Sequence, residues 1–293
     1  MTDLDVGVWR VVRADGPDWV ARWFPARRTV EAVTGDAEIL RYLAALDFPA
    51  ERCATAEPVS ILDGRPVLVT GWAQPVPREQ RRDAIRAAGG IARLGALLGR
   101  LHTLPPGDGA IARPGGGWHH VADGLPAAEI AAVSRMLAEA GHRFSDGERA
   151  AYEELCGQVA ALDAAEGLPE AFTHPDFALP NVVATQDDMI LVDWAGAGRG
   201  PRVWSLAFLL FAEGARDLRR VKLVLAGYRQ HVMLTGEELD RLAAIARARP
   251  LVLAAWAVSV GRLAPSVAVA RSAQLRELTD SVAATALAAL AGQ

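Results

Sequence analysis

The residues best suited to chemistry lie in one stretch, residues 173–207, which contains Asp176, Asn181 and Asp193 in a non-helical context. Two oxygen ligands a few ångströms apart suit Mg²⁺, which takes few protein carboxylates and completes its shell with water and phosphate oxygens. A further carboxylate that does not bind the metal can accept a hydrogen bond from an incoming hydroxyl group. Together these groups meet the needs of in-line phosphoryl transfer, a positioned nucleophile and a cation on the phosphates.

A hairpin is the element expected to bring these groups together. Val182-Val183 and Met189–Val192 are predicted to form its two strands, with Asn181 just before the first and Asp193 just after the second. Because a hairpin brings its ends together, Asn181 and Asp193 are expected to converge, with Asp176 nearby on the preceding loop.

Four motifs in this stretch resemble a known family: His174-Pro175-Asp176, Asn181, Val192-Asp193-Trp194 and Gly198-Arg199-Gly200-Pro201. Asp176 precedes Asn181 by five residues, and Asn181 precedes Asp193 by twelve. The chain thus resembles the aminoglycoside phosphotransferase and choline kinase superfamily, a relative of the protein kinases. The resemblance implies an α+β, two-lobed protein-kinase-like fold, with a small antiparallel-sheet N-lobe and a large, mainly helical C-lobe.

The resemblance also implies roles for individual residues. Asp176 is expected to orient and help deprotonate the acceptor hydroxyl, and Asn181 and Asp193 to hold the Mg²⁺ that bridges the nucleotide phosphates. Arg22 stands where the kinases carry a phosphate-binding lysine, and Glu38 is its expected ion-pair partner. Val20 lies on the same side of the strand as Arg22 and is expected to pack against the nucleotide base from below. Backbone groups that recognise the base are expected at Thr70, Gly71 and Trp72.

Three departures from the family pattern bear on activity. Pro175 replaces the usual glycine before the catalytic aspartate, and proline fixes φ. Ser205 replaces an aspartate that normally hydrogen-bonds the catalytic loop, so support for the loop is expected to come from elsewhere. Residues 7–16 contain no G-x-G-x-x-G.

The remaining elements divide the chain into an N-terminal nucleotide-binding lobe, residues 1–73, and a C-terminal lobe, residues 74–293, with the catalytic loop and the acceptor site. In the first lobe a helix is predicted over Gly35–Leu46, and strands over Trp9–Val12, Trp19–Phe24, Val59–Leu62 and Pro66–Thr70. In the second, helices are predicted over Asp83–Leu104, Ala127–Ala140, Asp146–Ala165, Val203–Gly214, Leu218–Leu234, Gly236–Arg249, Leu251–Ala264 and Val267–Leu290. Pro250 and Pro265 are expected to separate the last three. Ala112–Trp118 (ARPGGGW) is expected to be a flexible loop.

Composition excludes several other classes of function. A formal net charge of -4 gives the chain no electrostatic reason to bind nucleic acid. Two cysteines far apart in sequence, and no visible signal peptide, favour a reducing, cytoplasmic location. The apolar stretches Val203–Ala212 and Leu251–Gly261 are shorter than the ~20 residues of a membrane helix, so no membrane partner is expected.

The leading hypothesis is therefore a small-molecule kinase that moves the γ-phosphoryl group of ATP or GTP to a hydroxyl group. An aminoglycoside-like antibiotic, a sugar and an amino alcohol all remain open as acceptors, and the sequence does not indicate an oligomeric state. The alternative is a nucleotide-binding pseudokinase or regulator, which Pro175 and Ser205 motivate, and a third hypothesis is a helical interaction scaffold. His174 is interpreted as a structural loop residue, and His119-His120 as part of a solvated loop.

Overall fold

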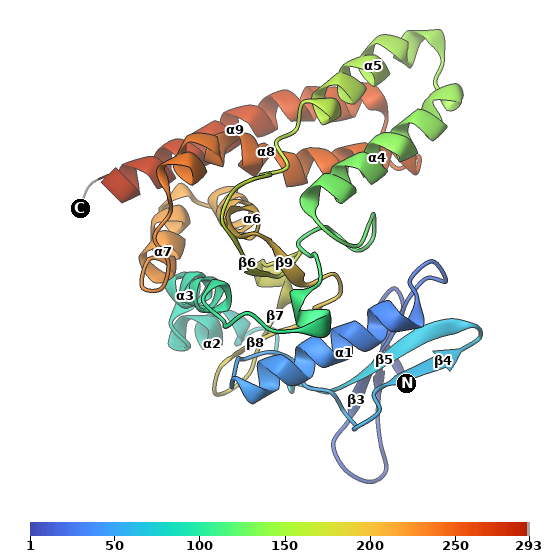
Figure 1. Ribbon diagram of the computed structural model, residues 1–293, viewed down its shortest axis with the longest axis vertical. Helices are drawn as coiled ribbons and strands as arrows, with labels where there is room; N and C mark the ends of the chain where they lie inside the picture. Colours follow the sequence, from blue (N-terminus) through green and yellow to red (C-terminus); the bar gives the residue numbers. More distant parts are fainter. Residues whose placement is uncertain (292–293) are drawn as a thin grey trace.

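The computed structural model describes residues 1–291, and the chain folds into a small sheet-containing lobe followed by a larger helical lobe (Figure 1). The first lobe contains β1 (Thr2–Asp5), β2 (Val8–Val11), β3 (Trp19–Trp23), α1 (Val30–Ala45), β4 (Val59–Leu62) and β5 (Arg65–Gly71). The five strands form one antiparallel sheet in the order β1-β2-β3-β5-β4. The predicted antiparallel sheet with one inserted helix is confirmed, and β1 is an additional strand.

The second lobe is built from eight helices among the described residues, and α8 and α9 run side by side along its outer edge (Figure 1). The helices are α2 (Arg81–Ala87), α3 (Gly90–His102), α4 (Pro126–Ala140), α5 (Asp146–Ala160), α6 (Arg202–Gly214), α7 (Leu218–Tyr228), α8 (Gly236–Ser259) and α9 (Pro265–Ala291). Two small antiparallel pairs lie among them: β6 (Glu170–Thr173) with β9 (Gly198–Pro201), and β7 (Val182–Ala184) with β8 (Met189–Leu191).

Several helix boundaries differ from the prediction. α1 begins at Val30 rather than Gly35, and α5 and α7 end at Ala160 and Tyr228 rather than Ala165 and Leu234. The helix expected over Asp83–Leu104 is interrupted at Gly89 and Gly90, whose positive φ angles of 97° and 64° are incompatible with a continuous right-handed helix. Pro250 does not separate two helices but lies inside α8. An interior proline costs about 3 kcal/mol of helix propensity, and the buried residues on both sides of Pro250 show that tertiary packing outweighs this cost here. The expected break at Pro265 is confirmed, because α9 begins there.

Because α8 continues through Pro250, it is long and apolar enough, by length and composition alone, to cross a membrane. However, 56% of its most apolar window is buried inside the protein. Such burial is typical of a core helix, so α8 is weak evidence for a membrane span.

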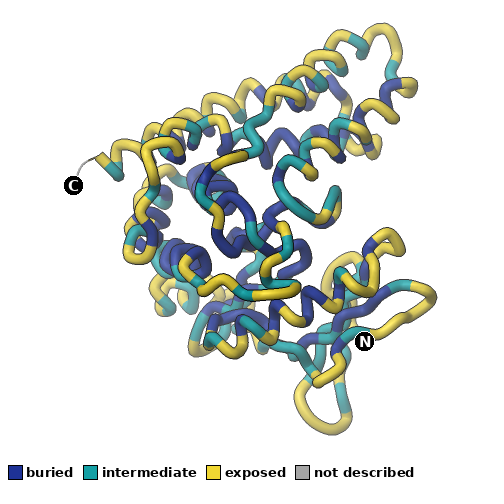
Figure 2. Tube along the Cα trace, viewed as in Figure 1, coloured by how far each residue is buried: buried dark blue, intermediate teal, exposed yellow. Residues whose placement is uncertain are grey.

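One hydrophobic core runs through both lobes and includes buried residues of the segment 173–207 that contains Asp176, Asn181 and Asp193. It includes Phe24 and Phe48 from the first lobe and Trp194 from this segment. The backbones also join, since Glu51 N–H donates to the Leu191 carbonyl at 2.9 Å. Figure 2 shows the buried chain concentrated in the centre of the molecule.

A buried histidine between α3 and α7 makes stability depend on pH. Burial, assisted by the charge of Arg202, lowers the pKa of His102 from its ordinary 6.5 to about 3, and its Nδ1 lies 2.9 Å from Tyr228 Oη. Because the folded pKa lies below the unfolded one, this contribution to stability is complete above pH 6.5. It falls as the pH drops from 6.5 toward 3, by up to about 1.4 kcal/mol per pH unit. Urea unfolding at pH 7.5 and 5.0 measures this effect. The decrease in the free energy of unfolding between the two pH values is expected to be smaller for His102→Gln than for the wild type. Equal losses in the two proteins would contradict this assignment.

Candidate active site

The catalytic loop places Asp176 and Asn181 in direct contact. Asn181 Nδ2 donates to the carbonyl and to Oδ2 of Asp176, both at 2.8 Å. A single 3-10 turn, η3 (Leu179–Asn181), brings the two side chains together. With its amide nitrogen used in this way, Asn181 retains Oδ1 as the atom able to bind a metal ion.

His174 connects this loop to the segment that leads into Asp193. Its Nδ1 accepts the Asp176 N–H at 3.0 Å, and its Nε2 lies 3.1 Å from the Val192 carbonyl, to which it donates. Burial lowers the pKa of His174, which favours the neutral ring that this pair of bonds requires. The structure therefore agrees with the structural interpretation of His174.

Arg22 and Asp193, 171 residues apart in the chain, form an ion pair across the two lobes. Arg22 Nη1 donates to Asp193 Oδ1 at 2.6 Å. Burial raises the pKa of Asp193, but the Arg22 charge and nearby histidines outweigh it, so the net pKa is lowered. Asp193 also adopts a left-handed φ of 69°, a conformation uncommon for non-glycine residues that is frequent at functional sites. Both groups are thus charged and aimed at the same point between the lobes.

The sequence analysis missed Glu51, whose carboxylate holds the backbone of Asp193 in place beside Arg22. Its Oε1 accepts the Asp193 N–H at 2.8 Å and its Oε2 accepts the Thr70 hydroxyl at 2.9 Å. Burial raises the pKa of Glu51, and the charge of Arg22 opposes this shift. Glu51 belongs to no periodic element, and the only signal for it was an acid directly after the apolar residues Phe48-Pro49-Ala50.

The expected pairing of Arg22 with Glu38 is wrong. Glu38 is exposed on α1 and has no ion pair with Arg22 among residues 1–291. The buried acid of this helix is Asp36, which pairs with Arg28 and Arg113 instead. The prediction chose Glu38 because the spacing of residues in a helix does not show which face of α1 is turned toward β3.

The residues expected to contact the base lie together at the ends of β3 and β5. Val20 pairs with Thr70 in the sheet, and Val20 and Arg22 occupy alternate positions on β3. However, the N–H groups of Gly71 and Trp72 donate to the carbonyls of Arg52 and Asp18, at 2.8 and 2.9 Å. These two N–H groups are therefore engaged within the protein, and the expectation that backbone groups of Thr70, Gly71 and Trp72 recognise the base stays a prediction.

The departure at Ser205 is compensated by two side chains. Ser205 Oγ itself donates to the His174 carbonyl at 3.0 Å, so the expectation that all loop support comes from elsewhere is only partly right. Arg249 adds to it, because its Nη2 donates to the carbonyls of Pro175 at 2.7 Å and Gly116 at 3.2 Å. Arg249 lies 3.2 Å from Glu129 in an ion pair that is almost completely buried.

The glycine run expected to be flexible is instead packed against β9. Gly115 N–H donates to the Arg199 carbonyl at 2.8 Å, and Gly115 is buried. A Cβ atom on Gly115 would lie only 2.3 Å from the Gly198 nitrogen. A neighbouring strand therefore orders a segment that has no conformational preference of its own.

Gly115→Ala is expected to lower the free energy of unfolding by about 1–3 kcal/mol, since the added methyl group must displace the β9 backbone. The matched control is Gly147→Ala in α5, where a Cβ atom meets nothing within 4 Å. Chemical denaturation of both variants measures the difference, and equal stability of the two would contradict the close approach.

The solvated-loop interpretation of His119-His120 is wrong for His119, which is buried with its ring edge against Phe24. Burial lowers the pKa of His119 to about 3. Within residues 1–291 no three His, Cys, Asp or Glu side chains are grouped so that they could hold a metal ion. Mg²⁺ does not need such a group, and one carboxylate from Asp193 with the amide oxygen of Asn181 fits its preference for few protein oxygens.

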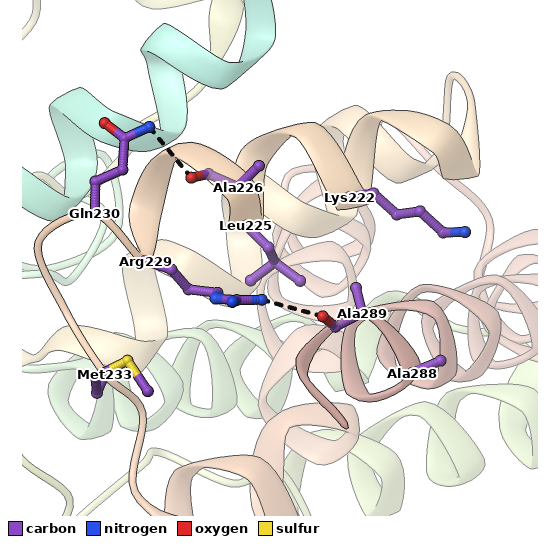
Figure 3. A pocket seen from close by; sticks show the side chains of 8 residues that line it. All are labelled: Lys222, Leu225, Ala226, Arg229, Gln230, Met233, Ala288 and Ala289. Atoms are coloured by element: carbon purple, nitrogen blue, oxygen red, sulfur yellow. Dashed lines mark hydrogen bonds between the residues drawn. The ribbon is translucent and has the colours of Figure 1, made fainter. Parts of the chain in front are cut away.

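A cavity of about 550 Å³ lies between α7 and the end of α9, far along the chain from this site (Figure 3). It is lined by residues such as Lys222, Met233 and Ala288, and none of the catalytic residues contributes to it. Arg229 Nη1 donates there to the Ala289 carbonyl at 3.1 Å. This cavity is therefore separate from the side chains of Asp176, Asn181 and Asp193.

The two-lobed fold, with an Asp–Asn loop and a following aspartate between the lobes, defines a protein-kinase-like phosphotransferase. The chain belongs to the phosphotransferase enzyme family, whose residue pattern matches residues 3–257. No curated protein sequence matches it significantly.

Several solved structures share the fold at low sequence identity. Choline kinase LicA from Streptococcus pneumoniae is 14% identical with a TM-score of 0.63, covering 94% of this chain and 92% of that one. Amicoumacin kinase hAmiN, solved with AMP-PNP, Ca²⁺ and Ami, is 15% identical with a TM-score of 0.60, covering 94% and 88%. An aminoglycoside phosphotransferase from Streptomyces rimosus, solved with ADP and streptomycin, is 19% identical with a TM-score of 0.51, covering 83% and 93%. The expected superfamily and fold are thereby confirmed.

Proposed function

We propose that the chain transfers the γ-phosphoryl group of ATP or GTP to a hydroxyl group of a small molecule, with Mg²⁺ as the metal ion. This proposal is carried by one observation: hydrogen bonds link the segment of the Arg22–Asp193 ion pair to the loop of the Asp176–Asn181 pair. Val192 N–H donates to the Asn181 carbonyl at 3.0 Å, and His174 bonds both Asp176 and Val192. One hydrogen-bonded network therefore fixes the spacing of all the proposed catalytic groups.

Each side chain has a role that its contacts support. Asp176 accepts a hydrogen bond from the acceptor hydroxyl and takes up its proton as the oxygen attacks phosphorus. Arg22 exchanges its bond to Asp193 for the nucleotide phosphates, because a guanidinium binds phosphate in the same forked geometry as carboxylate. Asp193 and Asn181 Oδ1 are then the oxygens that would hold Mg²⁺, which supplies charge neutralisation on the phosphates.

The nucleotide is proposed to lie against residues 1–73 and the acceptor against residues 74–293. The complexes of hAmiN with AMP-PNP and Ca²⁺, and of the Streptomyces rimosus enzyme with ADP and streptomycin, support a nucleotide and a small-molecule acceptor as the ligands, by similarity of fold. Both cysteines are free thiols, which fits a reducing, cytoplasmic location.

The experiment is a phosphoryl-transfer assay with γ-labelled ATP and GTP against streptomycin, choline, amicoumacin and simple sugars. Transfer that requires Mg²⁺ supports the proposal and identifies the acceptor. The pseudokinase alternative predicts nucleotide binding without transfer to any acceptor. The contacts of Ser205 and Arg249 with the catalytic loop count against that alternative, because they restore the support that the departures from the family pattern remove.

A further inference from the structure

A second cavity, of about 860 Å³, is lined by arginines from two distant parts of the chain. Arg78, Arg81, Arg82 and Arg86 come from α2 and the residues just before it. Arg216, Arg219 and Arg220 come from the turn between α6 and α7 and the start of α7. The fold therefore brings two arginine groups that are far apart in the sequence to one cavity.

Several of these arginines have no partner to neutralise them. Arg78, Arg82 and Arg216 are exposed, and their side chains form no hydrogen bond or ion pair within residues 1–291. Asp217 is the only acid that lines the cavity in the described chain, and it pairs with Arg219 at 2.8 Å. Arg86 pairs with Asp83 at 3.2 Å and Arg220 with Glu213 at 2.7 Å. The other four arginines of the cavity have no acidic partner within residues 1–291, so the cavity carries an excess of positive charge in a protein whose formal net charge is -4.

This arrangement costs stability, which favours a binding role over a passive one. Arg82 and Arg86 are like charges four residues apart on one short helix, a pairing that destabilises helices. Arg81 and Arg82 also occupy the first turn of α2, where the helix dipole disfavours positive charge. No protein group within residues 1–291 is bonded by the side chains of Arg78, Arg82 and Arg216, so packing of the fold gives no reason for these three charges.

We infer that this cavity binds a small polyanion carrying two or more phosphate groups. Guanidinium forks match phosphate oxygens in pairs, and arginines from two segments around one cavity suit a ligand with more than one phosphate. The volume lies within the usual range of a small-molecule site, about 300–1,000 Å³, which favours a compact ligand over a nucleic acid.

The cavity is separate from the proposed catalytic groups but adjoins the loop that carries them. Asp176, Asn181 and Asp193 do not line it, whereas Leu179 and Pro180 do. Arg81 Nη2 donates to the carbonyls of Leu179 at 3.1 Å and Val182 at 3.2 Å, on either side of Asn181. A polyanion bound in the cavity would thus contact Arg81, whose side chain bonds to the turn that contains Asn181, a proposed metal ligand.

The test uses inorganic tripolyphosphate as the probe, in the full chain, with EDTA and low salt to limit binding through a metal ion. Isothermal titration is expected to show binding that weakens roughly tenfold or more in the double variant Arg82→Ala/Arg216→Ala. Single inorganic phosphate is expected to bind far more weakly than tripolyphosphate. The double variant is expected to fold normally and to match or exceed the wild type in thermal stability, because both side chains are exposed and unpaired.

Two further variants separate this site from other sources of binding. Arg135→Ala/Arg271→Ala removes two exposed arginines elsewhere and changes the net charge equally, so it is expected to leave the affinity unchanged. Arg22→Gln is also expected to retain binding, which distinguishes the cavity from the proposed nucleotide site. Absent tripolyphosphate binding, or equal losses in the two double variants, would overturn the inference whatever the outcome for the proposed kinase activity.

Discussion

Replacing Asp176 with asparagine is expected to lower the rate of phosphoryl transfer by about 10²–10⁴-fold, the usual contribution of a positioned general base. Asparagine has almost the same shape as aspartate and can still accept the bond from Asn181 Nδ2, so the loop keeps its geometry. It cannot, however, take up the hydroxyl proton. Nucleotide affinity is expected to change little, because Asp176 is not proposed to bind phosphate or metal.

The matched control for this prediction is Asp187→Asn, which makes the same chemical change at an exposed turn between β7 and β8. It is expected to retain full activity. Equal rates for Asp176→Asn and the wild type would remove Asp176 from the mechanism. Wild-type turnover that disappears in Asp176→Asn would eliminate the pseudokinase alternative.

The second large effect is expected on stability, from Glu129→Ala. Glu129 is fully buried, pairs with Arg249 at 3.2 Å, and accepts the Trp118 N–H at 2.9 Å. Its removal leaves the charge of Arg249 buried without a counter-ion, which typically costs about 3–5 kcal/mol. Urea unfolding measures this loss, and Glu139→Ala at an exposed position on the same helix is the control.

A double variant distinguishes the buried charge from simple loss of packing. Glu129→Leu/Arg249→Met removes both charges and is expected to be more stable than Glu129→Ala, because no unpaired ion remains. It is also expected to transfer phosphate more slowly than the wild type, because the Pro175 carbonyl loses its donor. A double variant no more stable than the single one would contradict the charge argument.

The parts of the site that the sequence predicts well are those defined by local spacing. The five-residue spacing and a 3-10 turn bring the side chain of Asn181 against Asp176. The hairpin of β7 and β8 then brings the chain back, so that Asp193 follows close to Asn181. The alternation along β3 places Val20 and Arg22 on one side of the strand. These features depend on bond geometry within a few residues, so they survive without knowledge of the tertiary structure.

The parts that the sequence does not predict depend on packing between distant segments. Glu51 replaces Glu38 near Arg22 because the segment that follows α1 bonds to the backbone of Leu191 and Asp193, whereas Glu38 is exposed. Pro250 remains helical, and the run around Gly115 is ordered, because neighbouring elements fix them. The two arginine groups are some 130 residues apart, and only the fold places them on one cavity.

The most direct test of the proposed site is a thermal-shift comparison of the wild type and Asp193→Ala, with ATP and with GTP, each with and without Mg²⁺. Ligand at about 100 times its dissociation constant adds about 2.7 kcal/mol to the stability of the native state. A Mg²⁺-dependent shift with one or both nucleotides in the wild type, lost in Asp193→Ala, is the predicted result. No shift in the wild type with either nucleotide, or an undiminished shift in the variant, would contradict the assignment of this site.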